Sequence, residues 1–436
     1  MNVGFFFENG SSDEGMDLRH IDTVCPIKAG TPYLFFLIAH LLAVRDNGIS
    51  VTLFLWHRMV FNDAIRVECV GSLSEAHHLC AQLGINCLVV KHSDCYWETI
   101  KQTRAEAGVR YIVWCHNFVS FWRLRDYAKC DAVARLICVG REQADIYRDH
   151  RAFRKTDWIY NTVDNSLFKA SGKNLTPVSR RKHIVTYVGA VIPGKGFHVL
   201  AKAWPEVLKA VPDAQLYVIG NGKLYGDDVV LGDYGLAEKS YEKRFMKYLT
   251  DDSGRLLPSV HLMGLMGREK YSILEQTKVG VPNPSGLTET FCNSAVEMQL
   301  MGAVIASRRC TGYMDTVETG KLIDSPRRLA SCITDCLLAS DDNYRETFQA
   351  LEDKFSPETV ILQWEELLLH SIAQGKRLQP LLPLVHPDYE LKKYKEYLRK
   401  AKEQHPWLYT VLPSLGFFTE LWKKIKWAVW KYTYLK

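Results

Sequence analysis

Short apolar runs alternate with longer segments of helical period along most of the chain. The runs are bounded by glycine, proline, asparagine or aspartate, and the segments between them repeat apolar residues every three or four positions. Continuous apolar strands separated by helices are typical of parallel sheets covered by helices on both faces. We predict strands at residues 3–7, 50–56, 85–90, 109–114, 134–139, 183–188, 215–219, 260–263, 279–281 and 303–306, and helices at 33–45, 197–211, 294–300, 328–339 and 357–372.

The alternation stops once and restarts, which divides the chain into two similar halves. The break is a turn-rich, basic stretch at residues 169–183, which we interpret as a linker. We therefore predict an α/β protein with two Rossmann-like domains, residues 1–168 and 184–360, facing each other across a cleft. Ligands of such open sheets bind outside the carboxyl ends of the strands. Residues 361–375 are predicted to form a helix that returns to the first domain, and residues 223–258 an insertion.

The positive charge of the chain is concentrated at one end. The 436 residues include 55 Lys+Arg and 49 Asp+Glu, a formal net charge of +6. Residues 376–436 hold thirteen basic and five acidic residues, so this tail carries +8 and the first 375 residues carry −2. Because the body has no excess of positive charge, nucleic-acid binding is disfavoured.

The sequence predicts a cytoplasmic protein. It opens on a short strand-like run and lacks the charged and apolar regions of a signal peptide. Its 12 cysteines include no C-x-x-C pair, which favours a reducing compartment and no metal cluster. The longest apolar run, residues 33–44, is well short of the about 20 residues that span a bilayer.

One segment of the second half combines two carboxylates with the start of a helix. Glu289 lies in a loop rich in proline, glycine and serine, and Glu297 follows inside the predicted helix. A loop carboxylate can accept hydrogen bonds from sugar hydroxyls, and a helix N-terminus offers backbone N–H groups to a phosphate. The alternative is a capping acid followed by an exposed helix charge.

A second segment places a lysine where a predicted strand enters a glycine turn. Residues 187–196 read Tyr-Val-Gly-Ala-Val-Ile-Pro-Gly-Lys-Gly. Glycines let a ligand approach the backbone, and Lys195 is a point charge suited to a diphosphate. A strand, a glycine turn and a helix are common in α/β proteins, so this segment alone is not diagnostic.

Together and in this order, the two segments resemble the retaining glycosyltransferases of the GT-B fold, specifically family 4, whose signature is E-x7-E. Glu289 and Glu297 match that motif, with Pro284 and Ser285 before it and a helix after it. The resemblance covers roughly residues 1–375. Other segments similar to those of the family are residues 30–31, 114–117, 159–164 with 168, and 216–222.

The resemblance implies a role for each matched residue. Lys195 would neutralise the donor diphosphate, Glu289 would hold hydroxyls of the donor sugar, and Glu297 would bind the ribose. His116 would lie on the acceptor side near the reacting sugar, and its alternative is a core histidine with satisfied hydrogen bonds. The other donor-side residues would be Gly189, Gly220, Gly222, Thr290, Phe291, Cys292 and Asn293, and the other acceptor-side residues Gly30 and Thr31.

The family's chemistry would follow from the same resemblance. In the family, the leaving diphosphate is thought to deprotonate the acceptor on the face from which it departs, which retains the anomeric configuration. Such a reaction needs charge stabilisation at the phosphates, which a lysine and a helix dipole can supply. We therefore expect no cofactor and no metal, with a nucleotide sugar as the co-substrate.

Three positions depart from the family pattern. Ala190 stands where the family commonly has arginine, Cys292 where it has glycine, and Thr162 where it has a turn glycine. Without the arginine, the diphosphate must depend more on Lys195 or on a base from elsewhere. The substitutes that we consider are Lys223, Arg268 and Arg308.

The tail lies outside the region of resemblance. It contains a charged helix at residues 388–403 and a second helix at 417–434 that mixes aromatic residues with lysines, which suits an anionic membrane interface. The alternative is a helix that packs back on the first domain. One helical face carries Phe418, Leu421, Trp422, Ile425, Val429 and Tyr432; Lys423, Lys424, Trp427, Trp430 and Lys431 lie on the other.

The sequence thus predicts a retaining transferase of a sugar from a nucleoside-diphosphate donor, UDP favoured over GDP, to a glycan or lipid-linked acceptor. Surface polysaccharide or glycolipid synthesis is the expected setting, in the cytoplasm and peripherally at the inner face of a membrane through residues 406–436. One alternative is a GT-B nucleotide-sugar epimerase. Another is a non-catalytic glycan-binding scaffold of the same fold, for which Ala190 and Cys292 are the hints.

Overall fold

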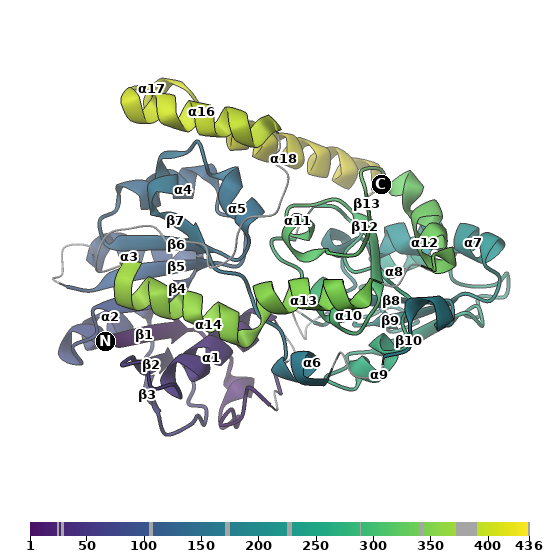
Figure 1. Cartoon of the computed structure of the whole chain (residues 1–436), viewed down its shortest axis with the longest axis horizontal. Helices are drawn as coiled ribbons and strands as arrows, with labels where there is room; N and C mark the ends of the chain where they lie inside the picture. Colours follow the sequence, from purple (N-terminus) through teal and green to yellow (C-terminus); the bar gives the residue numbers. More distant parts are fainter. Residues whose placement is uncertain are drawn as a thin grey trace. The chain divides into compact units, whose positions relative to one another are not determined.

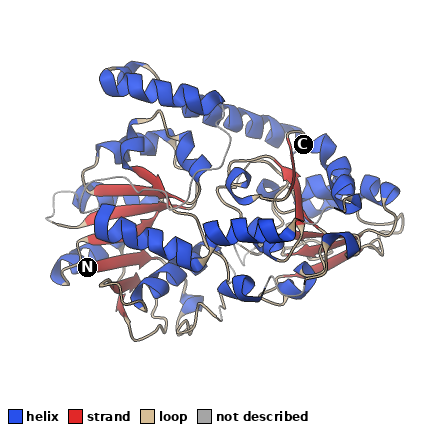
Figure 2. Cartoon of the chain, in the orientation of Figure 1, coloured by secondary structure: helices blue, strands red, loops and turns tan. Residues whose placement is uncertain are grey.

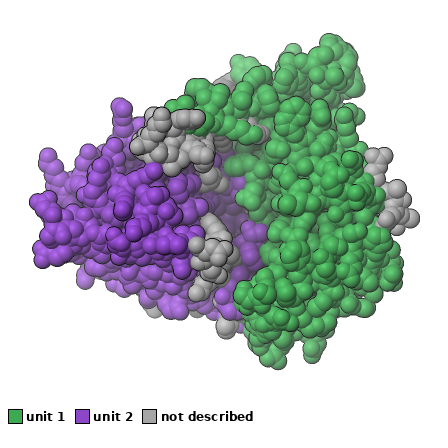
Figure 3. Space-filling view, turned by 180° about the vertical axis from the view of Figure 1, so that it is seen from behind, with its two compact units in different colours: residues 1–21, 35–160, 360–436 green, residues 22–34, 161–359 purple. Residues whose placement is uncertain are grey.

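The chain forms two compact units, each built on its own sheet. The computed structural model describes residues 1–23, 26–27, 30–103, 108–170, 175–224, 229–287, 289–340, 343–371 and 390–434. Unit 1 comprises residues 1–21, 35–160 and 360–436, and unit 2 comprises residues 22–34 and 161–359 (Figure 3). Because each unit is built from separate segments of the sequence, the chain passes between the units more than once.

Unit 1 is a seven-stranded sheet in which every strand pair is parallel (Figure 1). Its strand order is β3-β2-β1-β4-β5-β6-β7. Central strands such as β1 and β5 are almost entirely buried because helices cover both faces. The strands are β1 (Asn2–Phe7), β2 (Ser50–Leu55), β3 (Ile65–Cys69), β4 (Cys87–Lys91), β5 (Arg110–Cys115), β6 (Val133–Cys138) and β7 (Thr156–Trp158).

The helices of unit 1 include those of the basic tail. An aromatic cluster fills the core on one side of the sheet: the Trp114 ring lies 4.8 Å from that of Trp364 and 5.2 Å from that of Phe35. The helices that lie wholly or mostly in this unit are α1 (Gly30–Ala43), α2 (Leu73–Gln82), α3 (Trp97–Gln102), α4 (Phe121–Lys129), α5 (Arg141–Ile146), α14 (Pro357–Glu366), α16 (Glu390–Gln404), α17 (Leu408–Val411) and α18 (Leu415–Tyr434).

Unit 2 repeats the arrangement with six strands, again all parallel, flanked by helices (Figure 2). The strand order is β10-β9-β8-β11-β12-β13. Its strands are β8 (Ile184–Val188), β9 (Gln215–Ile219), β10 (Val260–Gly264), β11 (Val279–Gly280), β12 (Val304–Arg308) and β13 (Gly320–Ile323). Its helices are α6 (Asn165–Ala170), α7 (Phe197–Ala210), α8 (Lys239–Met246), α9 (Lys270–Leu274), α10 (Asn293–Leu300), α11 (Tyr313–Thr316), α12 (Leu329–Leu338) and α13 (Tyr344–Phe355).

The predicted α/β fold with two parallel-sheet units is confirmed, with corrections at its margins. The three strands β3, β7 and β13 were not predicted, and each lies at the edge of its sheet. The helix predicted to begin at residue 33 begins at Gly30, so Gly30 and Thr31 form the first turn of α1. Pro32 is compatible with that turn, because the first N–H groups of a helix have no partner within it.

The first helix of the tail packs on unit 1, an arrangement that the sequence left open. Helix α16 packs on unit 1 near α5, as Figure 1 shows, with Lys395 Nζ donating to Asp145 O at 3.0 Å. Residues 372–389, which include the end of the predicted helix 361–375 and the start of the predicted helix 388–403, lie outside the described residues. So do the side chains of Lys423, Trp427, Trp430, Lys431 and Tyr432. Among the helices that are described, none combines the length and the apolar character needed to cross a bilayer.

Candidate functional site

The donor-side residues expected from the sequence gather at one edge of the sheet of unit 2. Lys195 follows β8, Gly220 follows β9, Glu289 lies in the loop after β11, and Arg308 ends β12. The carboxyl ends of parallel strands lie at the same edge, where α/β proteins bind their ligands. Parallel topology therefore brings together residues that are far apart in the sequence.

Lys195 and Glu289 form the centre of this edge. Lys195 Nζ lies 2.5 Å from Glu289 Oε1, and the two side chains are only 21% and 10% exposed. Asn283 Nδ2 donates to the same carboxylate oxygen at 2.8 Å. The loop carboxylate is thus held in place by a cation and an amide, and Glu289 does not cap the following helix.

Gly196 and Ser285 bring the two loops into direct contact. Gly196 has a φ of +71°, and a Cβ atom at this position would lie 2.5 Å from the backbone nitrogen of Ser285. Ser285 is held in turn, because its N–H donates to Asn283 Oδ1 at 3.0 Å. A side chain at position 196 would separate the loops that carry Lys195 and Glu289.

Glu297 is buried inside α10 and has its own cation. Lys270 Nζ donates to both carboxylate oxygens, at 2.9 and 2.7 Å, and Tyr271 donates from its hydroxyl at 3.4 Å. Burial and the nearby Glu297 carboxylate raise the pKa of Tyr271, so its phenol is protonated. An exposed helix charge, the alternative for Glu297, is excluded by the 9% exposure of this residue.

Cys292 occupies a strained backbone position at the start of α10. Its φ is +82°, and among the described residues it is the one non-glycine residue with a positive φ. This conformation explains why a glycine would suit the position. Burial raises the pKa of the Cys292 thiol to about 12, so the thiol is neutral near pH 7 and no nucleophile.

The neighbours of Cys292 complete the helix start. Thr290 and Phe291 are buried, and Asn293 is the first residue of α10. Gly312 packs directly against the backbone of this segment. Its N–H donates to Glu289 O at 3.0 Å, and a Cβ atom at position 312 would lie 2.6 Å from Phe291 N. The N-terminal end of α10 is therefore fixed by backbone contacts.

The strand-end glycines pack against each other. A Cβ at Gly220 would lie 2.1 Å from Gly189 O, so a side chain cannot be accommodated there. Gly222 donates its N–H to Leu236 O at 2.9 Å, which links the end of β9 to the segment before α8. These glycines keep β8 and β9 close at the edge where the ligand is expected.

The three basic residues considered as substitutes for an arginine at Ala190 differ in their surroundings. Arg268 is paired with Asp164, with Nε 2.6 Å from Oδ2. Arg308 Nη1 donates to Ser285 O at 2.5 Å, in the loop that contacts Lys195-Gly196. Lys223 donates from its backbone N–H to Asn221 Oδ1 at 2.9 Å. Arg308 is thus the substitute whose side chain contacts the loop that carries Glu289.

The residues expected on the acceptor side belong to different units. His116 directly follows β5 in unit 1, and its ring centroid lies 4.5 Å from that of Trp114. Burial lowers the pKa of His116 to about 3, so its imidazole is neutral near pH 7. Gly30 and Thr31 belong to unit 2 and begin α1.

Sequence reasoning missed four residues that shape this site. Asn283, Lys270 and Tyr271 each contact one of the two motif glutamates, and Gly312 packs under the loop between them. For Asn283 and Lys270, the sequence offered one indication of a place at the site, since both come shortly after predicted strands. For Tyr271 and Gly312 it offered none. Among the described residues, no group of three or more His, Cys, Asp or Glu could hold a metal ion.

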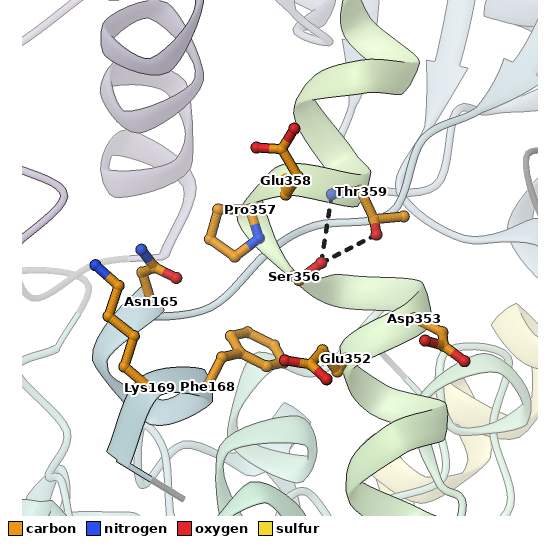
Figure 4. Close-up of a pocket in the computed structure, with 9 residues that line it drawn as sticks. All are labelled: Asn165, Phe168, Lys169, Glu352, Asp353, Ser356, Pro357, Glu358 and Thr359. Atoms are coloured by element: carbon orange, nitrogen blue, oxygen red, sulfur yellow. Dashed lines mark hydrogen bonds between the residues drawn. The ribbon is translucent and has the colours of Figure 1, made fainter.

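Unit 2 also has a pocket of about 380 Å³ outside these residues (Figure 4). It lies between α6 and the junction of α13 and α14, where Ser356 Oγ accepts from Thr359 N at 3.3 Å. None of the donor-side residues lines it. The lining residues are Asn165, Phe168, Lys169, Glu352, Asp353, Ser356, Pro357, Glu358 and Thr359.

Comparison with known proteins finds a family match in the second half of the chain. Residues 182–339 match the family model described as Glycosyl transferases group 1. This segment contains every donor-side residue, from Gly189 to Glu297. Spore coat protein SA of Bacillus subtilis (strain 168) is 24% identical over 245 residues, an alignment that covers 49% of this chain and 58% of the relative.

Solved structures show the same fold over most of the chain. Anabaena HepE, solved in complex with UDP and glucose, has a TM-score of 0.58 at 16% identity, over 85% of this chain and 99% of that one. The lipopolysaccharide outer core galactosyltransferase WaaB, in its apo form, has a TM-score of 0.57 at 11% identity, over 85% and 99%. The chain therefore has the GT-B fold, and its residues 182–339 are similar to the group 1 glycosyl transferases.

Proposed function

We propose that the chain is a retaining glycosyltransferase that uses a nucleoside-diphosphate sugar. The observation that carries the proposal is the junction of Lys195 and Glu289, 2.5 Å apart at the carboxyl edge of a sheet and beside a helix N-terminus. The sugar and the diphosphate of such a donor are adjacent groups. A cation beside a carboxylate can therefore bind the phosphates with one group and accept hydrogen bonds from the sugar hydroxyls with the other.

The donor roles follow from the contacts. Lys195 is assigned to the diphosphate, together with Arg308, whose guanidinium donates to Ser285 O in the neighbouring loop that contacts Gly196. Glu289, oriented by Asn283, is assigned to hydroxyls of the donor sugar. Glu297, oriented by Lys270, is assigned to the ribose hydroxyls. Gly189, Gly220, Gly222 and the backbone at residues 290–293 would line the donor.

The proposed chemistry depends on stabilising the leaving group. As the bond from the anomeric carbon to the diphosphate breaks, negative charge grows on the phosphate oxygens, and Lys195 with the N-terminal end of α10 would stabilise it. The acceptor hydroxyl forms the new bond on the same face, and its proton goes to the leaving phosphate. No protein nucleophile and no metal is assigned, and His116, Gly30 and Thr31 are assigned to the acceptor side.

UDP is the proposed nucleotide, with GDP as the competing choice, because the similar fold of HepE was solved with UDP and glucose. A glycan or lipid-linked acceptor in surface polysaccharide or glycolipid synthesis is proposed by analogy with the WaaB fold. Cytoplasmic action at the inner face of a membrane belongs to the same proposal.

The test is a thermal-shift and turnover screen of the full chain with UDP, GDP and their sugars. We expect stabilisation by UDP and its sugars, slow hydrolysis of one of them, and loss of that hydrolysis in Glu289→Ala. Donor turnover without acceptor that persists in Glu289→Ala would favour the epimerase. The absence of any nucleotide-induced shift would favour the non-catalytic scaffold, for which the strained Cys292 is the specific observation.

A further inference from the structure

The first half of the basic tail is anchored to unit 1 by buried lysines. Lys395 and Lys402 of α16 are 7% and 1% exposed. Lys395 Nζ donates to Asp145 O, and Lys402 Nζ donates to Asp149 O, each at 3.0 Å, at the end of α5 and in the turn that follows. Backbone carbonyls at a helix C-terminus attract cations, so these two charges hold α16 in place.

Asp149 fixes the beginning of the last helix. Its side chain is fully buried and accepts hydrogen bonds from Ser414 Oγ at 2.6 Å and from Leu415 N at 2.7 Å, while Lys402 Nζ lies 3.7 Å away. Gly416 packs so tightly that a Cβ there would lie 2.5 Å from Ile146 O. The start of α18 therefore has one defined position on unit 1.

Beyond this anchor, α18 presents an apolar strip to solvent. Phe417 still packs on Phe121, with ring centroids 6.1 Å apart. The residues that follow at helical spacing fall within about a 100° arc. They are Phe418, Leu421, Trp422, Ile425 and Val429, exposed by 53, 45, 56, 44 and 58%.

Exposed apolar side chains are concentrated in this tail. Of the eighteen large hydrophobic residues that are exposed in the described part of the chain, ten lie between Tyr394 and Val429. A soluble surface normally scatters such residues, whereas a contiguous group marks a binding surface. The same tail, residues 376–436, carries a net charge of +8.

We propose that the apolar strip of α18 binds the surface of an anionic lipid bilayer. The helix would lie in the interfacial plane with its strip among the acyl chains, because it is not apolar enough to span. Basic residues of the tail would add attraction to anionic headgroups. Since Asp149 and Lys402 fix the start of the helix, binding would orient unit 1 on the membrane. This inference does not depend on the transferase activity.

Co-sedimentation of the full chain with vesicles tests the proposal. We expect binding to vesicles of phosphatidylcholine and phosphatidylglycerol at 70:30, and at least about fivefold weaker partitioning into pure phosphatidylcholine, the factor for one lysine at the surface. The variant Ile425→Glu/Val429→Glu should lower the partition coefficient at least about tenfold. The matched control is Val230→Glu/Leu338→Glu, which changes two exposed apolar residues of unit 2 and should bind like the original chain.

Two results would overturn the proposal. One is equal sedimentation of the original chain and the Ile425→Glu/Val429→Glu variant, or no sedimentation of either, while their thermal unfolding midpoints agree. The other is a dimer in light scattering that this variant dissociates without any vesicle binding, which would assign the strip to a second copy of the chain. Nucleotide binding in all variants reports separately on the proposed transferase site.

Discussion

Lys195 and Glu289, which are 94 residues apart in the sequence, form an ion pair of 2.5 Å where the loops after β8 and β11 meet. Lys195 is assigned to the diphosphate and Glu289 to the sugar. While the two side chains are paired, each neutralises the charge of the other. A phosphate must compete with Glu289 for Lys195. Removing Lys195 and removing the charge of Glu289 should therefore have different effects on nucleotide binding.

Lys195→Ala should weaken UDP binding by about tenfold to a hundredfold, the range for losing a charge-assisted contact of about 1.5–3 kcal/mol. Glu289→Gln should leave UDP binding unchanged or make it tighter, because Lys195 loses its competitor, while sugar transfer falls. Titration calorimetry with UDP checks both. Lys202→Ala, an exposed lysine of α7, is the control. UDP binding by Lys195→Ala at the original affinity would contradict the assignment.

Gly196→Ala should lower stability for two reasons, the positive φ of position 196 and its contact with Ser285. The variant Gly235→Ala separates the two effects. Gly196 and Gly235 have nearly equal φ values of +71° and +68°, but only the first has a neighbour within 4 Å, at Ser285. Gly235→Ala should cost about 1 kcal/mol in unfolding free energy through its backbone alone. Gly196→Ala should cost more and also weaken UDP binding. Equal effects in urea unfolding would show that the contact with Ser285 is unimportant.

Cys292 offers a test of stored backbone strain. Cys292→Ala removes the thiol and keeps the strain at φ +82°, whereas Cys292→Gly removes both. We expect the glycine variant to be more stable than the alanine variant by about 1 kcal/mol in urea unfolding. A more stable alanine variant would mean that the positive φ costs nothing here.

The strands that sequence reasoning found and missed differ in burial. The central strands, such as β1 and β5, are continuous apolar runs because both faces are covered. The edge strand β3 alternates, with Arg66 and Glu68 both partly or fully exposed, and thus lacks that signal. The three strands that were not predicted are all edge strands, although the edge strand β10 was predicted, so partial exposure at a sheet edge weakens the apolar signal without always removing it.

The candidate site shows a similar division. Lys195, Glu289 and Glu297 were predicted because motif and loop composition pointed to them. Asn283 and Lys270 were not, because their role exists only where parallel topology brings the ends of different strands together. Nothing in the charge pattern of the sequence indicates that Lys270 pairs with Glu297, which lies 27 positions further on. The start of the first helix, predicted at residue 33, was wrong for a local reason, because Pro32 fits the first turn of a helix as well as a loop.

Asp149 should control whether the tail stays attached to unit 1. Asp149→Ala leaves Lys402 buried without its carboxylate, at an expected cost of about 3–5 kcal/mol. We expect limited proteolysis to remove the tail after residue 404 much faster in this variant. Asp213→Ala, which removes an exposed carboxylate of unit 2, is the control. Unchanged proteolysis of the tail in Asp149→Ala would show that other contacts suffice.

His150 should make the stability of unit 1 depend on pH. Its ring lies 5.7 Å from that of Phe121, its Nδ1 accepts from Ala152 N at 3.0 Å, and burial lowers its pKa to about 4. As pH falls from 6.5 to 4, the unfolded chain binds a proton that the folded chain does not. Stability present above pH 6.5 is thus lost in that window, by about 2–3 kcal/mol.

His150→Asn removes this titration and keeps an oxygen that can accept from Ala152 N–H. Urea unfolding between pH 7 and 4 should show a shallower loss of stability in the variant than in the original chain. His78→Asn, a change at an exposed ring of α2, should leave the slope as it was. The partly buried His116 and His198, whose pKa values are lowered to about 3 and 4, keep a residual slope in every variant. Equal slopes for His150→Asn and the original chain would show that His150 titrates alike in the folded and unfolded states.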